Sequence, residues 1–447
     1  MTLTEMRPVW LAVRAGSARG TSLRGGRFSA DMPTLSILGK QRRAPKSYYT
    51  GTHRLISPER TVARVSRLAS VAGITRIANV TGLDTIGVPV VMVCRPNSRS
   101  LAVAQGKGLT LAAAKASGLM EAMEGYHAER ITLPLKLASY EELRYTHNVI
   151  DVSLVPQPTS GVFHPTLPLL WIEGHDLLQD ERVWVPYELV HLNYTLPLPP
   201  GTGCFVASSN GLASGNHLLE AISHGISEVV ERDATTLWDL RGEAAKDNTR
   251  VDLDSIDDPD CRAVLEKYRQ AGVAVAVWET TSNLGIPSFV CLIAERTTNP
   301  LHPRPSTQGY GCHPARTIAL LRALTEAAQC RLTYISGSRD DLGRSSYEHH
   351  LSLTTQQTDL ARMAIRGPMR SFRAIPNFQS ATFNEDVAWE LTRLRSAGIA
   401  RVIVVDLTKP ELGVPVVRVV IPGLEPKASV TGYIPGRRAR AIMENPA

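Results

Sequence analysis

The chain has 447 residues, 43% hydrophobic and 20% charged, which is enough to bury a large core in one big domain or in two closely joined ones. It contains no run of about 18 apolar residues, so a membrane-spanning helix is excluded. The formal net charge of +7 comes from residues 1–47, which hold nine Lys or Arg and two acids. The rest of the chain is therefore near neutral, which argues against nucleic-acid binding.

Residues 1–45 are rich in Gly, Ser and Arg, and only a short VWLAV run is apolar. We predict that they form a basic, flexible N-terminal extension. Binding of an acidic peptide partner is the functional alternative for this segment.

The six cysteines form no CxxC pair and no disulfide-like cluster. Because disulfides persist in oxidising compartments, this spacing indicates core thiols in a reduced compartment. We therefore expect a cytoplasmic protein without a thiolate metal centre.

Ordered structure is predicted to begin near Lys46. A short helix over residues 62–71 is expected after Pro58, followed by two β-rich runs around Gly82 that end in an apolar strand over residues 88–94. A Gly-Lys-Gly turn at residues 106–108 then leads into a helix. This turn lacks the spacing of a Walker motif, so it does not predict a P-loop.

The helix after this turn carries its polar groups on one side. Ser117, Glu121 and Glu124 have relative offsets of 0, 4 and 7 residues, which places them within about 60° of arc. The other positions are mostly Ala, Leu and Met. The helix is therefore predicted to present one narrow acidic face.

Residues 131–200 are rich in Pro and hydrophobic residues. They predict a strand, a turn at residues 179–181 and a second strand that ends at Pro186. His175 and His191 lie in this region without partners at metal-ligand spacing, so we interpret them as structural.

The stretch from Ala207 to Ala234 predicts a loop of small polar residues that feeds a second helix. Asn216, Glu220, Glu228 and Glu231 fall within an arc of about 120° on this helix. Carboxylates on an otherwise apolar helix repel one another and resist burial unless cations neutralise them. For one helix alone, a solvated acidic face is the simpler interpretation.

The C-terminal half continues with a helix within residues 257–268, two strands within 273–295 and a glycine-containing loop over 307–313. In the third polar-faced helix that follows, Arg322, Glu326 and Gln329 repeat the offsets 0, 4 and 7. We then predict a polar insertion at residues 342–372, a helix over 385–396, two strands and a basic tail. The alternation of strands and helices predicts an α/β architecture with connected sheets flanked by helices.

Three helices with polar groups on one narrow face indicate that these faces converge. Mg²⁺ binds a few carboxylates together with substrate phosphates, and Arg232 and Arg322 offer forked donors to phosphate oxygens. Ser117, Asn210, Asn216 and Gln329 can orient metal-bound waters or phosphates. The pattern therefore predicts a non-Walker nucleotide site, with two or more Mg²⁺ ions held by six carboxylates: Glu121, Glu124, Glu220, Glu228, Glu231 and Glu326.

Three segments resemble the signatures of the YcaO superfamily. SGLMEAMEGY is similar to its Sx3Ex2E motif, SNGLASGNHLLEAISHGISEVVERDA to its second signature and GYGCHPARTIALLRALTEAAQCRL to its third. Similar phrases extend from KSYYTGTHR to DLTKPELGVPVVRVVIPGLE. The resemblance implies the YcaO fold and an ATP-dependent enzyme that phosphorylates a backbone amide oxygen of a peptide, so that a nucleophile attacks the carbonyl carbon and phosphate leaves.

The resemblance also implies roles for individual residues. It makes Glu228, Glu231, Arg232 and Arg322 the expected catalytic residues, and the six carboxylates the expected Mg²⁺ ligands. The expected ATP contacts are Lys46, Arg54, Ser117, Asn210, Asn216, Arg232, Arg322 and Gln329. We expect the catalytic domain to span residues 46–436 and a C-terminal tail to occupy residues 437–447.

One position departs from the family pattern. Glu124 is followed by Gly125, where the first motif usually has an arginine. Arg76 and Arg130 are the candidates to replace that arginine.

The phrases GTHR, ISGSRDD and VVRVVIPGLE most resemble family members that work with a TfuA-like partner protein and an external sulfur donor. Thioamidation of a precursor peptide or of a protein is therefore the first hypothesis. The end of the chain, ARAIMENPA, does not resemble the PxPxP tail of azoline-forming members, and no E1-like domain is fused to it.

Other activities stay open. Cyclodehydration of Cys, Ser or Thr to azolines is the second hypothesis, and macrolactamidine formation is the third. A non-catalytic nucleotide-binding accessory protein is the alternative from another class. A homodimer is expected at the level of the family only.

Overall fold

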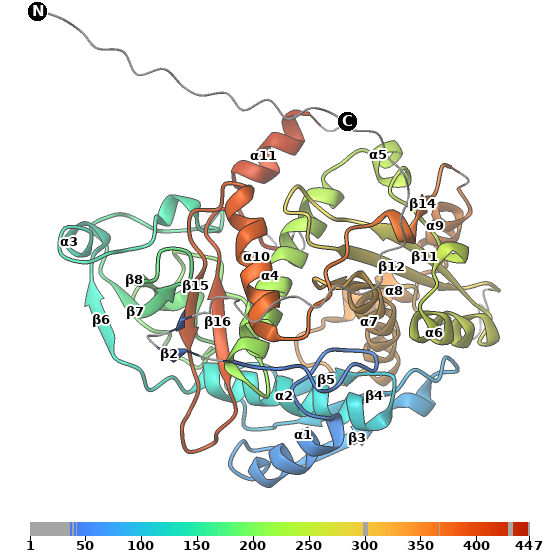
Figure 1. Ribbon diagram of the computed structural model, residues 1–447, viewed down its shortest axis with the longest axis horizontal. Coiled ribbons are helices and arrows are strands. Elements are labelled where there is room, and N and C mark those ends of the chain that lie inside the picture. The colour runs from blue at the N-terminus through green and yellow to red at the C-terminus, as the bar shows by residue number, and fades with distance from the viewer. Residues whose placement is uncertain are drawn as a thin grey trace, which may run out of the picture. The chain divides into compact units, whose positions relative to one another are not determined.

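The computed structural model describes residues 36–37, 40–41, 43–297, 303–365, 367–427 and 432–445. The expected extension, residues 1–45, therefore lies almost entirely outside the described residues. Three principal sheets combine with three long helices, α2 (Leu111–Glu129), α4 (Leu218–Asp239) and α7 (Arg316–Ser336) (Figure 1). The predicted α/β architecture with connected sheets is confirmed.

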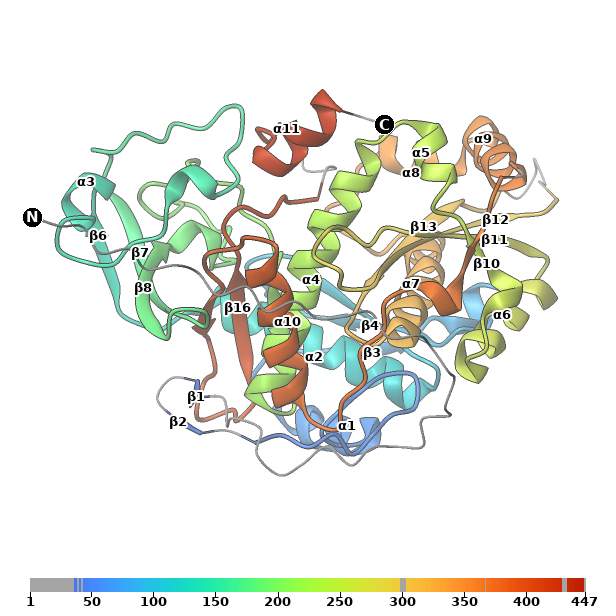
Figure 2. The ribbon, with the colours of Figure 1, turned by 45° about the horizontal axis from the view of Figure 1, so that its top comes forward.

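The largest sheet has six strands in the order β6-β7-β15-β16-β9, with β8 also paired to β7. Side chains alternate between its two faces, so Val416 packs in the core that contains α2, whereas Val417 packs in the core that contains α4. Helix α10 (Phe383–Ser396) lies alongside α4 in both views (Figures 1 and 2). The strands are β6 (Leu135–Ala138), β7 (Leu169–Asp176), β8 (Glu181–Pro186), β9 (Leu212–Ser214), β15 (Ile403–Asp406) and β16 (Val416–Val420).

The second sheet lies between α2 and α7. It is an antiparallel meander of β3 (Arg76–Asn79), β4 (Val90–Cys94) and β5 (Val103–Lys107). Val91 and Val93 of β4 pack in the core with α2, whereas Val90 and Met92 pack against Leu332 of α7. Strand β5 approaches α2 very closely, because a Cβ atom on Gly106 would lie 2.1 Å from the backbone oxygen of Ala114.

The third sheet corrects one prediction. The glycine-containing loop expected over residues 307–313 is strand β13 (Thr307–Cys312), which pairs with β12 (Ser288–Glu295), itself paired with β11 (Val273–Glu279). A Cβ atom on Gly311 would lie 2.0 Å from the backbone oxygen of Ala319 on α7. The glycines therefore allow the strand to pack closely on the helix. In the sequence alone, such glycines look the same as those of a loop.

The remaining elements complete the description. The helix predicted over residues 62–71 is wrong in its bounds: α1 begins at Pro58, is capped by Ser57 and ends at Val65, before a 3₁₀ turn. The segment 342–372 contains two helices, and the basic tail forms α11, where Arg438 pairs with Asp233 at 2.8 Å. The further elements are β1 (Ser36–Ile37), β2 (Lys40–Gln41), α1 (Pro58–Val65), α3 (Tyr140–Leu143), α5 (Glu243–Asp247), β10 (Val251–Asp252), α6 (Pro259–Gln270), α8 (Arg344–Leu351), α9 (Leu353–Ala364), β14 (Arg370–Ser371) and α11 (Arg437–Glu444).

In the described part of the chain, no helix has both the length and the apolar character needed to cross a lipid bilayer.

Candidate functional site

A cavity of about 760 Å³ lies where the polar faces of α2, α4 and α7 meet. Ser117, Glu121 and Glu124 of α2 line it together with the carboxylates of α4 and with groups of α7. Its volume is within the range of small-molecule and cofactor sites. The predicted site residues that line the cavity are Arg54, Ser117, Glu121, Glu124, Asn216, Glu220, Glu228, Glu231, Arg232, Arg322, Glu326 and Gln329.

Some of these carboxylates are paired with cations. The Lys107 ammonium lies 2.7 Å from Glu326, and the Arg54 guanidinium lies 3.5 Å from Glu220. Glu231 has its neighbour Arg232 at 3.5 Å. The cavity therefore carries internal counter-ions for three of its six glutamates.

The other three glutamates have no ion pair within the described residues. Burial raises the pKa of Glu124 to about 8, although Ser214 donates a 2.6 Å hydrogen bond to its Oε1. Desolvation within the cavity likewise raises the pKa values of Glu121 and Glu228, although Glu121 remains accessible to solvent. Carboxylates that are desolvated in this way bind a proton or a metal ion. The cavity is thus short of positive charge, which fits Mg²⁺ with its preference for oxygen ligands.

An arginine is available for an anion on the same cavity wall. Arg322 donates a 2.9 Å hydrogen bond to the backbone oxygen of Cys312, and it has no ion pair in the described chain. Burial, and next the nearby Arg54, lower the pKa of the Arg322 guanidinium. A guanidinium without an ion pair beside desolvated carboxylates is a donor set that suits a magnesium-bound polyphosphate. The residues present therefore fit both ATP and Mg²⁺, and their individual roles stay predictions.

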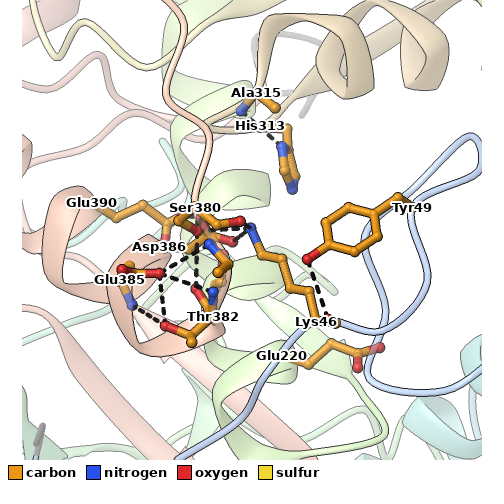
Figure 3. A network of polar contacts seen from close by, with 12 residues as sticks. Lys46, Tyr49, Glu220, His313, Ala315, Ser380, Thr382, Glu385, Asp386 and Glu390 are labelled. Carbon is orange, nitrogen blue, oxygen red and sulfur yellow. Dashed lines mark hydrogen bonds and ion pairs between the residues drawn. The ribbon is translucent and has the colours of Figure 1, made fainter. Parts of the chain in front are cut away.

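Two predicted ATP contacts lie outside the cavity lining. The Lys46 ammonium lies 2.6 Å from Oδ2 of Asp386 and donates to Oγ of Ser380 at 2.9 Å, with both charged side chains fully buried (Figure 3). Asn210 does not line the cavity either, and its side-chain oxygen is buried without a hydrogen-bond partner among the described residues.

Two histidines lie close to Asp386, the partner of Lys46. His53, His313 and Asp386 offer ligand atoms within 4.8 Å of one another, a spacing compatible with a metal ion. Burial, followed by the charge of Lys46, lowers the pKa of His53 to about 3. Since the lysine already neutralises Asp386, this cluster contains its own cation (Figure 3).

The sequence interpretation missed Lys107, which lies at the end of β5 and points into the cavity. Its Gly-Lys-Gly turn lacks the spacing of a Walker motif, so sequence reasoning assigned it no role. The pair of glycines was the sequence signal for this lysine. A Cβ atom on Gly106 would lie 2.1 Å from Ala114 and one on Gly108 would lie 2.6 Å from Ala113, so both glycines allow close packing on α2. A lysine between two such glycines is held on a fixed backbone.

Arg95 is the second residue that the sequence missed. Neither Arg76 nor Arg130, the two candidates to replace the arginine absent at Gly125, lines the cavity, whereas Arg95 does. A Cβ atom on Gly125 would lie 2.8 Å from Nη1 of Arg95, whose Nη2 lies 2.6 Å from Glu129. The glycine thus leaves room for an arginine that comes from the end of β4.

The comparisons with known proteins agree with this geometry. Two relatives are each 36% identical to the chain: a protein in the tfuA 3′ region of Rhizobium leguminosarum bv. trifolii, matched over 88% of this chain and 93% of its own length, and a Methanothermobacter thermautotrophicus protein, matched over 81% and 92%.

Solved structures are similar as well. A heterocyclase in complex with substrate and cofactor matches with a TM-score of 0.74 and 26% identity. The match covers 91% of this chain and 56% of the heterocyclase chain. YcaO from Methanopyrus kandleri, bound with AMPPCP and Mg²⁺, matches with a TM-score of 0.67 and 22% identity over 86% of this chain and 95% of its own.

The family described as YcaO cyclodehydratase, ATP- and Mg²⁺-binding, matches residues 105–425. This range contains all three helices whose carboxylates line the cavity. ATP and Mg²⁺, the cofactors expected from the sequence, are those of the family. The chain belongs to the YcaO family.

Proposed function

We propose that this protein uses ATP and Mg²⁺ to activate a backbone amide of a ribosomally made precursor peptide or of a protein, and that sulfide then converts the amide to a thioamide. The observation that carries the ATP-dependent step is the convergence of three helical carboxylate faces on one cavity, with Glu121, Glu124 and Glu228 left unpaired within the described residues.

In this proposal the protein supplies charge and position. The γ-phosphoryl group passes from ATP to the amide oxygen, sulfide attacks the carbonyl carbon, and the oxygen leaves as phosphate. Mg²⁺ supplies Lewis-acid stabilisation of the charge on the transferring phosphoryl group. Glu228 and Glu231 would hold the metal, while Arg232 and Arg322 would bind and orient phosphate oxygens.

The thioamide product rests on the resemblance to TfuA-associated members and on the relative in the tfuA 3′ region. A TfuA-like partner and a sulfur donor belong to the same proposal, as do a cytoplasmic location and a homodimer. We further propose residues 46–436 as the catalytic domain, with the basic extension before it and the short tail after it.

A second candidate is cyclodehydration of Cys, Ser or Thr to azolines. The family description and the heterocyclase similarity favour it. It uses the same ATP site and differs in the nucleophile, which would be a side chain of the peptide itself, as also in macrolactamidine formation. A non-catalytic nucleotide-binding accessory protein is the alternative from another class, and biological activity that stays intact in Glu228→Gln or Glu231→Gln would make the enzyme proposal fail.

The test is co-expression of the chain with the candidate precursor peptide and the neighbouring partner protein, followed by intact and tandem mass spectrometry. A mass change equal to exchange of one oxygen for sulfur, absent with Glu231→Gln, supports thioamidation. Loss of one water at Cys, Ser or Thr would transfer the assignment to azoline or amidine formation. Modification that persists in Glu231→Gln and Glu228→Gln would refute the metal-dependent proposal.

A further inference from the structure

Lys107 is the one lysine among the described residues that line the cavity. Alternation along β5 directs Val103, Gln105 and Lys107 to the face opposite α2, where Gln105 accepts a 2.7 Å hydrogen bond from Thr333 of α7. The close approach of Gly106 to α2 fixes the backbone beside the lysine. The origin of the side chain is therefore fixed, whereas its four-carbon stem has several rotatable bonds.

The ammonium group of Lys107 occupies a position between several carboxylates. It lies 2.7 Å from Oε2 of Glu326 and interacts electrostatically with Glu121 and Glu231 as well. Burial opposes its charge, yet Glu326 first among its neighbours raises the pKa of Lys107 overall. In the ligand-free protein Lys107 thus neutralises part of the negative charge of the cavity glutamates.

This position conflicts with metal binding. A divalent cation coordinated by Glu326 would lie within a few ångströms of the ammonium and repel it at the effective dielectric of a protein interior. The Lys107 side chain is 23% exposed, so it can leave without unfolding the site. An anion must then receive it, because an unpaired ammonium in this cavity is costly.

The bound nucleotide provides that anion. Glu231 interacts electrostatically with Lys107 and also with Arg322, so both cations lie near this carboxylate. A polyphosphate bound through metal ions on Glu231 and Glu326 would share one cavity with both Arg322 and Lys107. A lysine suits this exchange because its compact charge sits on a flexible stem, unlike the planar guanidinium of arginine.

We propose that Lys107 exchanges partners, pairing with Glu326 in the ligand-free protein and with a phosphate oxygen of the nucleotide once Mg²⁺ occupies the carboxylates. This inference rests on the proposed function and adds a residue to its phosphate site. Lys107 then competes with free Mg²⁺ for Glu326, which weakens binding of Mg²⁺ alone. The same side chain binds a phosphate of the magnesium-nucleotide complex, which strengthens binding of the nucleotide.

The test is isothermal titration calorimetry on the full chain and on Lys107→Met, with Mg²⁺ alone and then with AMPPCP at saturating Mg²⁺. Removal of the competitor should strengthen binding of Mg²⁺ alone, and loss of a charged hydrogen bond should weaken AMPPCP binding, each by about tenfold. Lys115→Met is the matched control, because Lys115 lies on α2 outside the cavity lining. Lys107→Arg should recover part of the AMPPCP affinity.

A double-mutant cycle of Lys107→Met and Glu326→Gln keeps the proposal testable if one variant is poorly stable. Thermal melting should show a coupling between the two residues in the ligand-free protein, and the coupling should vanish with Mg²⁺ and AMPPCP bound. Unchanged AMPPCP affinity in Lys107→Met, or a coupling that persists with ligand, would overturn the exchange while leaving the proposed function intact. A wild-type chain that fails to bind AMPPCP with Mg²⁺ would overturn both.

Discussion

Helix α7 takes part in two clusters of charged residues that differ in their balance. Near its C-terminal end, Arg331 pairs with Asp84 at 2.9 Å and also with Glu295, while Arg304 pairs with Asp84 at 2.8 Å. This cluster contains two cations and two anions and neutralises itself. In the cavity, by contrast, Glu121, Glu124 and Glu228 have no ion pair within the described chain. The difference separates an ion network that holds the fold from one that is arranged for an added cation.

The largest expected effect is the loss of activity in Glu231→Gln. If Glu231 holds the metal as proposed, removing its charge should lower ATP turnover with the precursor peptide by about 10³-fold, as for other preorganised electrostatic groups. The same change relieves repulsion among buried carboxylates, so the free energy of unfolding without metal should stay equal or rise. Phosphate release and chemical denaturation measure the two quantities.

Glu141→Gln is the control for that experiment, because Glu141 lies on α3 in an exposed pair with Arg144. It should change neither turnover nor unfolding. Turnover within threefold of wild type in Glu231→Gln would mean that the unbalanced cluster does not bind the catalytic metal.

The balanced cluster should respond in the opposite way to Arg331→Met. Removal of the fully buried Arg331 takes one of two cations from Asp84 and the nearer cation from Glu295, which should cost about 3–5 kcal/mol in the free energy of unfolding. The affinity for Mg²⁺ of the molecules that stay folded should not change, because Arg331 does not line the cavity. Denaturant titration and calorimetry check the two statements.

The exposed pair of Arg144 and Glu141 again gives a control. Arg144→Met should lower the free energy of unfolding far less than Arg331→Met does, because solvent screens this exposed pair. A similarly small cost for Arg331→Met would contradict a structural role for the Asp84 cluster.

A smaller effect is expected at Gly106, which links the strand of Lys107 to α2. In Gly106→Ala the new Cβ atom would meet the backbone oxygen of Ala114 at 2.1 Å, so the strand must move away. Such overpacking costs about 1–3 kcal/mol and would shift Lys107, lowering AMPPCP affinity. Gly343→Ala is the control, since nothing lies within 4 Å of the added atom. Equal melting temperatures for both variants would refute the packing argument.

These glycines also show what the sequence could and could not predict. The offsets of Glu121, Glu228 and Glu326 within their helices predicted the shared cavity, because helical geometry fixes a face from spacing alone. The glycines of β13 were mistaken for a loop, since close approach to α7 is a property of the packed structure. Lys46 could not be placed, because Asp386, its partner, lies 340 residues further along the chain.

The smallest expected effect is the pH dependence of the unbalanced cluster. With the pKa of Glu124 raised to about 8, the folded protein at neutral pH keeps a proton that the unfolded chain, with its ordinary pKa of 4.5, has lost. The contribution of this group to stability without metal should therefore fall as the pH rises from about 4.5 to about 8. Mg²⁺ needs the ionised carboxylate, so its affinity should rise over about pH 6 to 8 and then level off.

Calorimetry in buffers of different ionisation enthalpy counts the protons released when Mg²⁺ binds. Ser214→Ala removes the 2.6 Å hydrogen bond that favours the charged form of Glu124, so its pKa should rise further and the pH profile for Mg²⁺ should shift upward. A Mg²⁺ affinity that is flat between about pH 6 and 8.5 would mean that Glu124 does not lose a proton when the metal binds. Glu124 would then not belong to the unpaired carboxylates that distinguish the cavity from the Asp84 cluster.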